Sequence, residues 1–202
     1  MTKAINNMTV NDTRQQDKTE LYTFNQICLK ENNRLRQLHN SPKLKLSNRL
    51  MKSAQLHSKH LHELRQLQQL TDIKYGQNMA LIIGEENYKI AGLRAIRAWY
   101  KQSENYDYNE HNQEFKNYFT QMIWRETIKV GFGFVKSNTG NIMFIVGHYL
   151  PVGNKIFNYH DNVLPKIEEV NETINTDNIS KFSHKNSNEL QPSCSSGHCV
   201  II

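Results

Sequence analysis

Cysteine is scarce in this chain of 202 residues, which holds three copies. Two of them follow residue 190, so Cys28 is the single thiol in the first 190 residues. One thiol cannot form a disulfide within a domain, which excludes the disulfide-rich secreted scaffolds as a class. Cys28 falls on an apolar helical periodicity, and we interpret it as a small core residue rather than a nucleophile.

Long hydrophobic runs are also missing. The longest uninterrupted apolar runs are residues 79–83 and 142–146, far short of the roughly 18 residues of a membrane span. The first twenty residues are polar, so we expect no secretory signal. Position 2 is Thr2 rather than the glycine that N-myristoylation requires. With the scarce cysteine, these features favour a cytosolic protein.

Two widespread catalytic motifs are absent from the sequence. It contains neither the G-x-x-x-x-G-K-[ST] loop that binds nucleotides nor the G-x-S-x-G elbow of hydrolases. Basic and aromatic residues do mix at Arg94, Arg97, Trp99 and Tyr100. Their helical spacing favours core packing with snorkelling arginines over nucleic-acid binding.

A group of histidines could in principle hold a metal ion. His57 and His60 lie one helical turn apart, and His62 and Glu63 follow. His57, however, belongs to an apolar stripe, and the other three fall on or near the exposed side of the same predicted helix. We therefore favour ordinary helix residues over a metal site.

The net charge of +6 is unevenly distributed. Residues 161–202 carry six acidic side chains against three lysines, and the remainder carries 22 basic against 13 acidic ones. A basic globule could attract an anionic membrane or nucleic acid, or it could simply be well solvated. Charge alone leaves these alternatives open.

Apolar periodicities predict three helices after a polar tail at residues 1–18. The first begins at Leu21 and ends before Pro42, the second covers about residues 48–70, and the third covers about residues 90–102.

The most informative stretch is a fourth helix that leads directly into a hairpin. Phe115, Phe119, Met122 and Ile123 recur at the spacing of one helical face. Two apolar segments follow, residues 129–135 and 141–150, joined by a turn at Ser137-Asn138-Thr139-Gly140.

This passage resembles the CAP superfamily of cysteine-rich secretory, antigen 5 and pathogenesis-related proteins. Residues 118–127 read YFTQMIWRET, close to the family signature H-F-T-Q-x-x-W-x-x-T/S, and residues 149–154 read YLPVGN, close to Y-x-P-x-G-N. Residues 76–80, GQNMA, are similar to the family segment G-E-N-L-A. The resemblance implies an α+β fold, a CAP α-β-α sandwich with a small antiparallel sheet between helices, at residues 19–162. The intracellular, membrane-associated branch of the family fits best.

CAP domains commonly hold two histidines and two glutamates that bind a divalent metal such as zinc. The resemblance places these four positions at Gln66, Gln77, Gln102 and Tyr118, or at His62 instead of Gln66 if the alignment shifts. Amides are poor zinc ligands. We therefore expect no metal, no cofactor and no catalytic residue, and a neutral polar cluster whose amides and Tyr118 could hydrogen-bond to one another.

The last four residues, Cys199-Val200-Ile201-Ile202, form a C-a-a-X box. This motif predicts prenylation of Cys199, and an aliphatic last residue favours geranylgeranyl over farnesyl. One lipid chain holds a protein only reversibly, so Cys194 is a candidate for palmitoylation. Residues 163–202 are poor in apolar side chains and predict a flexible, disordered tail.

These features predict a non-enzymatic CAP domain tethered to the cytosolic face of a membrane, Golgi or endosomal by resemblance. Its partners would be membrane lipids, a second copy of the chain or another protein, and not nucleic acid. The alternatives are a metal-independent hydrolase that uses the CAP cleft and a secreted, extracellular defence or venom-type protein.

Overall fold

The computed structural model describes residues 2–71, 73–109, 118–167 and 199–200, without the side chains of residues 2–14 and 199–200. Most of the tail predicted to be flexible, including Cys194, lies outside the described residues. No helix in these ranges combines the length and the apolar character that spanning a bilayer requires.

A five-stranded sheet forms the centre of the molecule, in the order β1-β3-β4-β2-β5. β1 pairs with β3 in parallel, and all other neighbours are antiparallel. The strands are β1 (Lys45–Leu46), β2 (Gly76–Ile83), β3 (Lys129–Lys136), β4 (Ile142–Leu150) and β5 (Cys199–Val200).

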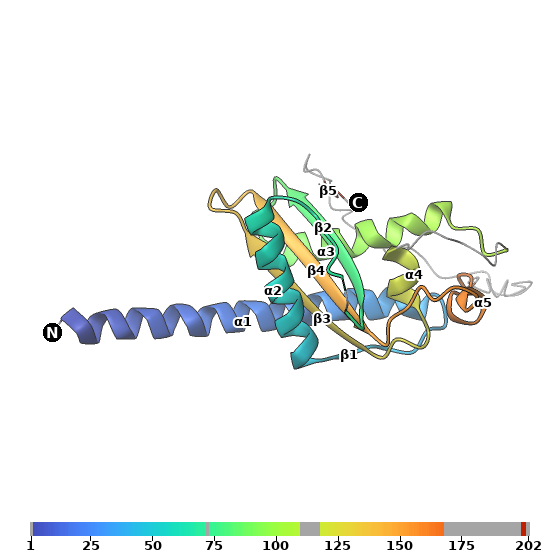
Figure 1. The fold of residues 1–202 in the computed structure, drawn as a ribbon, viewed down its shortest axis with the longest axis horizontal. Helices are drawn as coiled ribbons and strands as arrows, with labels where there is room; N and C mark the ends of the chain where they lie inside the picture. The colour runs from blue at the N-terminus through green and yellow to red at the C-terminus, as the bar shows by residue number, and fades with distance from the viewer. Residues whose placement is uncertain (1, 72, 110–117, 168–198, 201–202) are drawn as a thin grey trace, which may run out of the picture.

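Helices cover both faces of this sheet. Helix α2 packs on one face, over β3 and β4, while α1, α3 and α4 lie on the other (Figure 1). The helices are α1 (Thr2–Gln37), α2 (Asn48–Leu64), α3 (Tyr88–Lys101), α4 (Tyr118–Ile123) and α5 (Tyr159–Asn162), with a 3-10 turn at Gln102–Asn105. The predicted α-β-α sandwich is confirmed.

The first helix is longer than the sequence pattern predicted. We expected a polar tail over residues 1–18 and a helix from Leu21, but α1 begins at Thr2. No glycine or proline precedes Pro42, so nothing in this stretch breaks a helix. Phe24 is the first buried residue among those whose side chains are described, and the earlier part of the helix extends away from the sheet (Figure 1).

The predicted helix and hairpin are present, although Phe115, which we placed on the face of that helix, lies outside the described residues. All six residues of α4 are buried, and β3 pairs with β4 across the turn that ends at Gly140. Gly131 and Gly133 on β3 lie directly beneath α2. A Cβ at Gly131 would stand 2.1 Å from the Met51 nitrogen, so these glycines let the helix approach the sheet closely.

Helix α2 ends earlier than predicted, at Leu64 rather than near residue 70. Arg65 adopts a left-handed conformation, with φ of 55°, and its N–H donates to the last turn of the helix. This is a common way for a helix to end. The chain from Gln66 onward then forms the loop that leads to β2.

Arg36 joins α1 to the segment after α4. Its guanidinium is fully buried and donates at 2.8–3.0 Å to four backbone carbonyls. The acceptors belong to Pro42, Met122, Trp124 and Thr127. Desolvation lowers the pKa of Arg36 to about 10, so it stays charged at neutral pH. A buried charge needs such complete hydrogen bonding.

Candidate functional site

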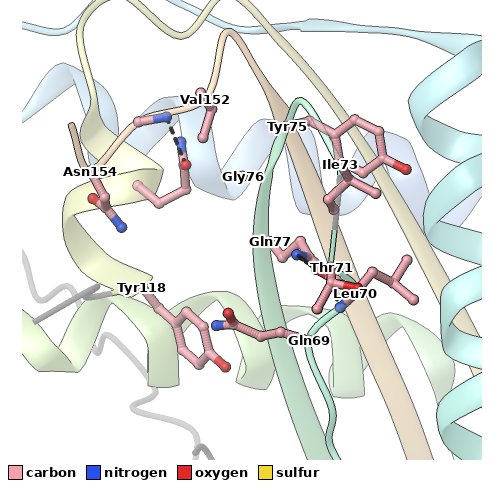
Figure 2. A pocket seen from close by; sticks show the side chains of 12 residues that line it. Gln69, Leu70, Thr71, Ile73, Tyr75, Gly76, Gln77, Tyr118, Val152 and Asn154 are labelled. Carbon is pink, nitrogen blue, oxygen red and sulfur yellow. Dashed lines mark hydrogen bonds between the residues drawn. The ribbon is translucent and has the colours of Figure 1, made fainter.

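A cleft of about 390 Å³ opens where the loop before β2, the start of α4 and the segment after β4 meet. The described residues that line it carry amides, hydroxyls and apolar side chains, and none of them is Asp, Glu, Lys, Arg or His (Figure 2). The lining residues are Gln69, Leu70, Thr71, Ile73, Tyr75, Gly76, Gln77, Tyr118, Gln121, Val152, Gly153 and Asn154.

Gln77 enters this cleft from β2, but both ends of its amide are occupied. Its Oε1 accepts from the Leu70 N–H at 2.9 Å, and its Nε2 donates to the Leu70 carbonyl at 2.9 Å (Figure 2). The side chain therefore pairs with the Leu70 backbone as a neighbouring strand would. A carboxylate could accept the first bond but could not donate the second.

The same two-sided pairing recurs elsewhere in the domain. Three further side-chain amides each bind both the N–H and the C=O of one distant residue, at 2.7–3.1 Å. The pairs are Asn25 with Phe132, Asn33 with Leu44, and Gln55 with Phe134. We call these three amides and that of Gln77 the amide clamps. Gln77 thus belongs to a set that holds the fold together.

Gln102 and Tyr118 meet at the other side of the cleft. The Gln102 Oε1 accepts from the Tyr118 backbone N–H at 2.7 Å, so Gln102 fixes the first residue of α4. The Tyr118 side chain is 4 % exposed, and its hydroxyl has no well-formed hydrogen bond to the described residues. Burial raises the pKa of Tyr118 to about 12, although the nearby Met79 backbone offsets part of that rise.

The remaining predicted position does not reach the cleft. Gln66 is exposed just after α2 and is not among the lining residues, and His62 packs edge-on against Phe144 instead. Gln69 lines the cleft, and its amide points toward the Tyr118 ring (Figure 2). The structure therefore brings Gln77 and Tyr118 to one cavity, places Gln102 directly behind Tyr118, and leaves Gln66 outside.

The two signature segments build the rest of the cleft. The Gln121 Oε1 accepts from the Gly153 N–H at 2.9 Å, and its Nε2 donates to the Thr127 hydroxyl at 3.3 Å. A Cβ at Gly76 would stand 1.8 Å from the Gln121 Oε1. Glycine at this position therefore makes room for the amide that joins the segments.

A zinc ion does not fit this donor set. Zinc takes imidazole, thiolate and carboxylate ligands, whereas the polar side chains among the described lining residues are amides and hydroxyls, including the phenols of Tyr75 and Tyr118. Within the described ranges, no group of three or more His, Cys, Asp or Glu residues could hold a metal ion. We therefore expect titration calorimetry with zinc to show no stoichiometric binding.

A buried histidine pair lies beside the cleft. The His57 Nδ1 and the His148 Nε2 are 3.1 Å apart, and the His57 Nε2 lies 2.9 Å from the Gln68 carbonyl. A carbonyl only accepts, so His57 carries its proton on Nε2 and receives the His148 Nε2–H at Nδ1. Desolvation and the neighbouring His57 lower the pKa of His148 to about 3, and desolvation also lowers the pKa of His57.

Sequence reasoning treated His57 as a core residue and did not single out His148. Both are buried, as the apolar stripe around His57 indicated. Their pairing joins α2 to β4 across 91 positions of sequence, and no local pattern could have revealed it.

A second concave surface lies between α1 and α3, and we call it the α1–α3 groove. Its floor is apolar, and its cavity volume is about 440 Å³. Four cationic side chains and one carboxylate border it, a net charge of +3. The lining residues are Ile27, Lys30, Glu31, Arg34, Lys89, Ile90, Leu93 and Arg97.

Glu31 organises part of the groove. Its carboxylate pairs with Arg34 at 2.9 Å and with Arg97 at 3.3 Å. Hydrogen bonds from Arg34 hold the pKa of Glu31 below its usual range despite partial burial. Lys30 and Lys89 are exposed, with no salt bridge to a described residue, and Ile90 is 46 % exposed.

The predicted prenylation site, Cys199, lies in β5, at the outer edge of β2. Its backbone pairs with Ile82, and its side chain is not described.

Comparison with known proteins now adds to this geometry. The model of the CAP, or cysteine-rich secretory protein, family matches residues 29–149. The human Golgi-associated plant pathogenesis-related protein 1 is 32% identical over 148 residues, covering 70% of this chain and 93% of that protein. A probable pathogenesis-related protein of Candida albicans is 33% identical over 146 residues, covering 71% of this chain and 67% of that protein.

Solved structures agree on the fold. NaASP2, solved with Zn²⁺, matches with a TM-score of 0.56 at 18% identity, over 71% of this chain and 85% of that one. The Schistosoma mansoni venom allergen-like protein 4 matches with a TM-score of 0.53 at 18% identity, over 71% and 95%. The family match covers more than half of the chain, and the signature segments lie at the cleft. The chain therefore belongs to the CAP family of cysteine-rich secretory proteins.

Proposed function

We propose that this chain is a non-enzymatic CAP-domain protein that binds anionic membrane lipids through the α1–α3 groove and is tethered to the membrane by a prenyl group on Cys199. The observation that carries this proposal is the combination of an apolar floor and a cationic border in one groove. A lipid has the same two parts, an acyl chain and a charged headgroup.

The lysines of the groove supply the attraction to anionic headgroups. Arg34 and Arg97 share the Glu31 carboxylate, so part of their charge is neutralised. Lys30 and Lys89 keep exposed ammonium groups. A lysine near an anionic membrane surface contributes about 1 kcal/mol of binding free energy. The exposed Ile90, which lines the same groove, offers apolar area to the acyl region.

The cleft supports a non-enzymatic protein because its amides already serve the fold. Gln77 binds Leu70, Gln102 binds the Tyr118 backbone, and Gln121 binds Gly153. None of these amides can act as a general acid or base near neutral pH. The buried Tyr118 hydroxyl is also a poor acid, since its pKa is raised to about 12.

The tether completes the proposal. The C-a-a-X sequence at residues 199–202 supports prenylation of Cys199, and Cys194 would receive a second, palmitoyl chain. The name of the human relative, which is Golgi-associated, supports a Golgi membrane for this chain too.

Cell fractionation of the full chain and its Cys199→Ser variant tests the tether. We expect the full chain in the membrane pellet and most of Cys199→Ser in the supernatant. Val200→Leu is the matched control, because it keeps an aliphatic residue in the motif and should remain with membranes. Membrane association that is unchanged in Cys199→Ser would overturn the tether.

A further inference from the structure

The outer edge of β2 is poorly protected for an edge strand. Its eight residues, GQNMALII, include no charged side chain and no proline. Proteins usually protect a long apolar edge with charges, prolines or a covering segment, because its unpaired N–H and C=O groups can recruit another strand. Beyond β4, the only described strand that pairs with β2 is β5.

β5 consists of Cys199 and Val200. It pairs with β2 in an antiparallel register, with Val200 opposite Leu81 and Cys199 opposite Ile82. Helix α3 also contacts this strand. Figure 1 shows β5 beside β2, next to the C-terminus. The segment that covers the edge thus comes from more than one hundred positions further along the chain than β2.

We propose that the outer edge of β2 at Leu81 and Ile82 is a docking site for an extended peptide, and that its occupant is this chain's own C-terminal segment. Binding by strand addition uses backbone hydrogen bonds, which any extended segment without proline can form. A docked segment is withheld from a modifying enzyme, so docking competes with lipid attachment at Cys199. That consequence, unlike docking itself, rests on the proposed function.

Backbone geometry allows docking of the C-terminal segment to be measured at the amides of Leu81 and Ile82. Successive N–H groups of a strand point to opposite edges. Of the Leu81 and Ile82 amides, one therefore points toward β4 and the other toward β5. The amide on the β4 side is an internal control, because its hydrogen bond does not depend on the C-terminal segment.

The experiment compares amide hydrogen exchange at Leu81 and Ile82 in two unmodified full-length variants. The double variant Cys199→Pro/Val200→Pro cannot donate backbone hydrogen bonds from the segment. The matched control, Cys199→Ser/Val200→Thr, keeps both N–H donors and also lacks the lipid attachment site. We expect exchange of one amide to be at least about tenfold faster in the proline variant, while the other is unchanged. The control should exchange like the unsubstituted chain.

Two results would overturn the proposal. One is equal exchange of both amides in the proline variant and the unsubstituted chain. The other is protection that grows with protein concentration, which would assign the edge to the segment of a second copy. Cys199→Ser removes the lipid attachment site but keeps the backbone N–H donor. If a chain with this substitution leaves the membrane while its β2 amide stays protected from exchange, the tether and the docking are distinguished.

Discussion

The cleft and the α1–α3 groove have similar volumes, but several polar side chains of the cleft are hydrogen-bonded within the domain and two lysines of the groove are exposed. In the cleft, Gln77 and Gln121 each make two hydrogen bonds within the domain. In the groove, Lys30 and Lys89 are exposed at the border of an apolar floor. Gln77 and Gln121 therefore hold parts of the fold together, whereas Lys30 and Lys89 are cations of the groove with no salt bridge to a described residue.

Under the proposed function, the positions at which the family resemblance places metal ligands stabilise the fold of this chain, and the α1–α3 groove is the surface that binds a ligand. A side chain that already satisfies two backbone groups gains nothing by turning to a ligand, because it would leave those groups unsatisfied. An exposed lysine carries no such cost.

Arg36 gives the largest expected effect on the structural side. Arg36→Met would leave four backbone carbonyls without their donor, three of them buried and one partly buried, and we expect the free energy of unfolding to fall by at least about 4 kcal/mol. Should this variant not fold, Arg36→Lys keeps the charge and should lose about 2 kcal/mol. Urea unfolding measures both.

The exposed Arg34 provides the control for Arg36. Arg34→Met removes one of the two arginines that pair with the buried Glu31 carboxylate, and Arg97 remains beside it, so we expect a loss of about 1–2 kcal/mol, well below that for Arg36→Met. Equal losses for Arg36→Met and Arg34→Met would show that the carbonyl contacts do not stabilise the fold.

His148 predicts how stability depends on pH. Desolvation and His57 lower its pKa from 6.5 to about 3 in the folded chain. Between these values the unfolded chain binds a proton that the folded chain does not, so the free energy of unfolding falls as the pH drops below 6.5. At about 1.36 kcal/mol per pH unit, His148 alone lowers it by about 2 kcal/mol between pH 6.5 and 5.

The variant His148→Gln should reduce the dependence of the free energy of unfolding on pH. A glutamine amide can still donate to the His57 Nδ1 but does not titrate. His57 and His39, whose pKa values burial also lowers, account for the slope that stays. Denaturant unfolding at several pH values measures how the free energy of unfolding changes with pH. An identical pH dependence in the unsubstituted chain and in His148→Gln would contradict a buried neutral imidazole at His148.

Gln77→Glu restores the residue type that the family signature carries and gives the smallest expected effect. The carboxylate can accept from the Leu70 N–H, but it faces the Leu70 carbonyl with no proton to donate. We expect a loss of about 1–2 kcal/mol in urea unfolding at neutral pH. Gln69→Glu, an exposed amide of the same cleft, should change stability by less than about 0.5 kcal/mol. Equal stability of Gln77→Glu and the unsubstituted chain would show that the hydrogen bonds between Gln77 and Leu70 do not stabilise the fold.

Much of the fold could be predicted because its signals are local. The face formed by Phe119, Met122 and Ile123 and the alternation that follows it specified α4 and the hairpin, and the structure confirms both. The length of α1 was missed, since its first half has no apolar face by which a helix is recognised. The end of α2 was missed because Arg65 gives no glycine signal for a left-handed cap.

The candidate site could be predicted only in part. Motif matching located Gln77, Gln102 and Tyr118 near the cleft but could not show that Leu70 is the partner of Gln77. It also placed the fourth position at Gln66, which the shorter α2 leaves outside the cleft. Contacts between residues far apart in sequence, such as the amide clamps and the His57–His148 pair, follow from tertiary packing and leave no periodic trace.

The α1–α3 groove could not be predicted either, because it depends on contacts between residues far apart in the sequence. Arg97 was interpreted as a snorkelling residue of α3, and the structure instead pairs it with Glu31 on α1. The two helices bring Lys30 and Lys89 to one surface, although 59 positions separate them in the sequence. The cationic border therefore becomes visible only when α1 and α3 pack together.

The most direct test of the account is the affinity of the unmodified full-length chain for vesicles of phosphatidylcholine with phosphatidylserine. We predict that Lys30→Gln/Lys89→Gln weakens binding by roughly thirtyfold, from about 1 kcal/mol per lysine. The matched control Lys52→Gln/Lys59→Gln removes two exposed lysines from α2, on the opposite face of the sheet, and should weaken it far less. Equal affinities of the two double variants, or no preference of the unsubstituted chain for the anionic vesicles over phosphatidylcholine alone, would contradict the account.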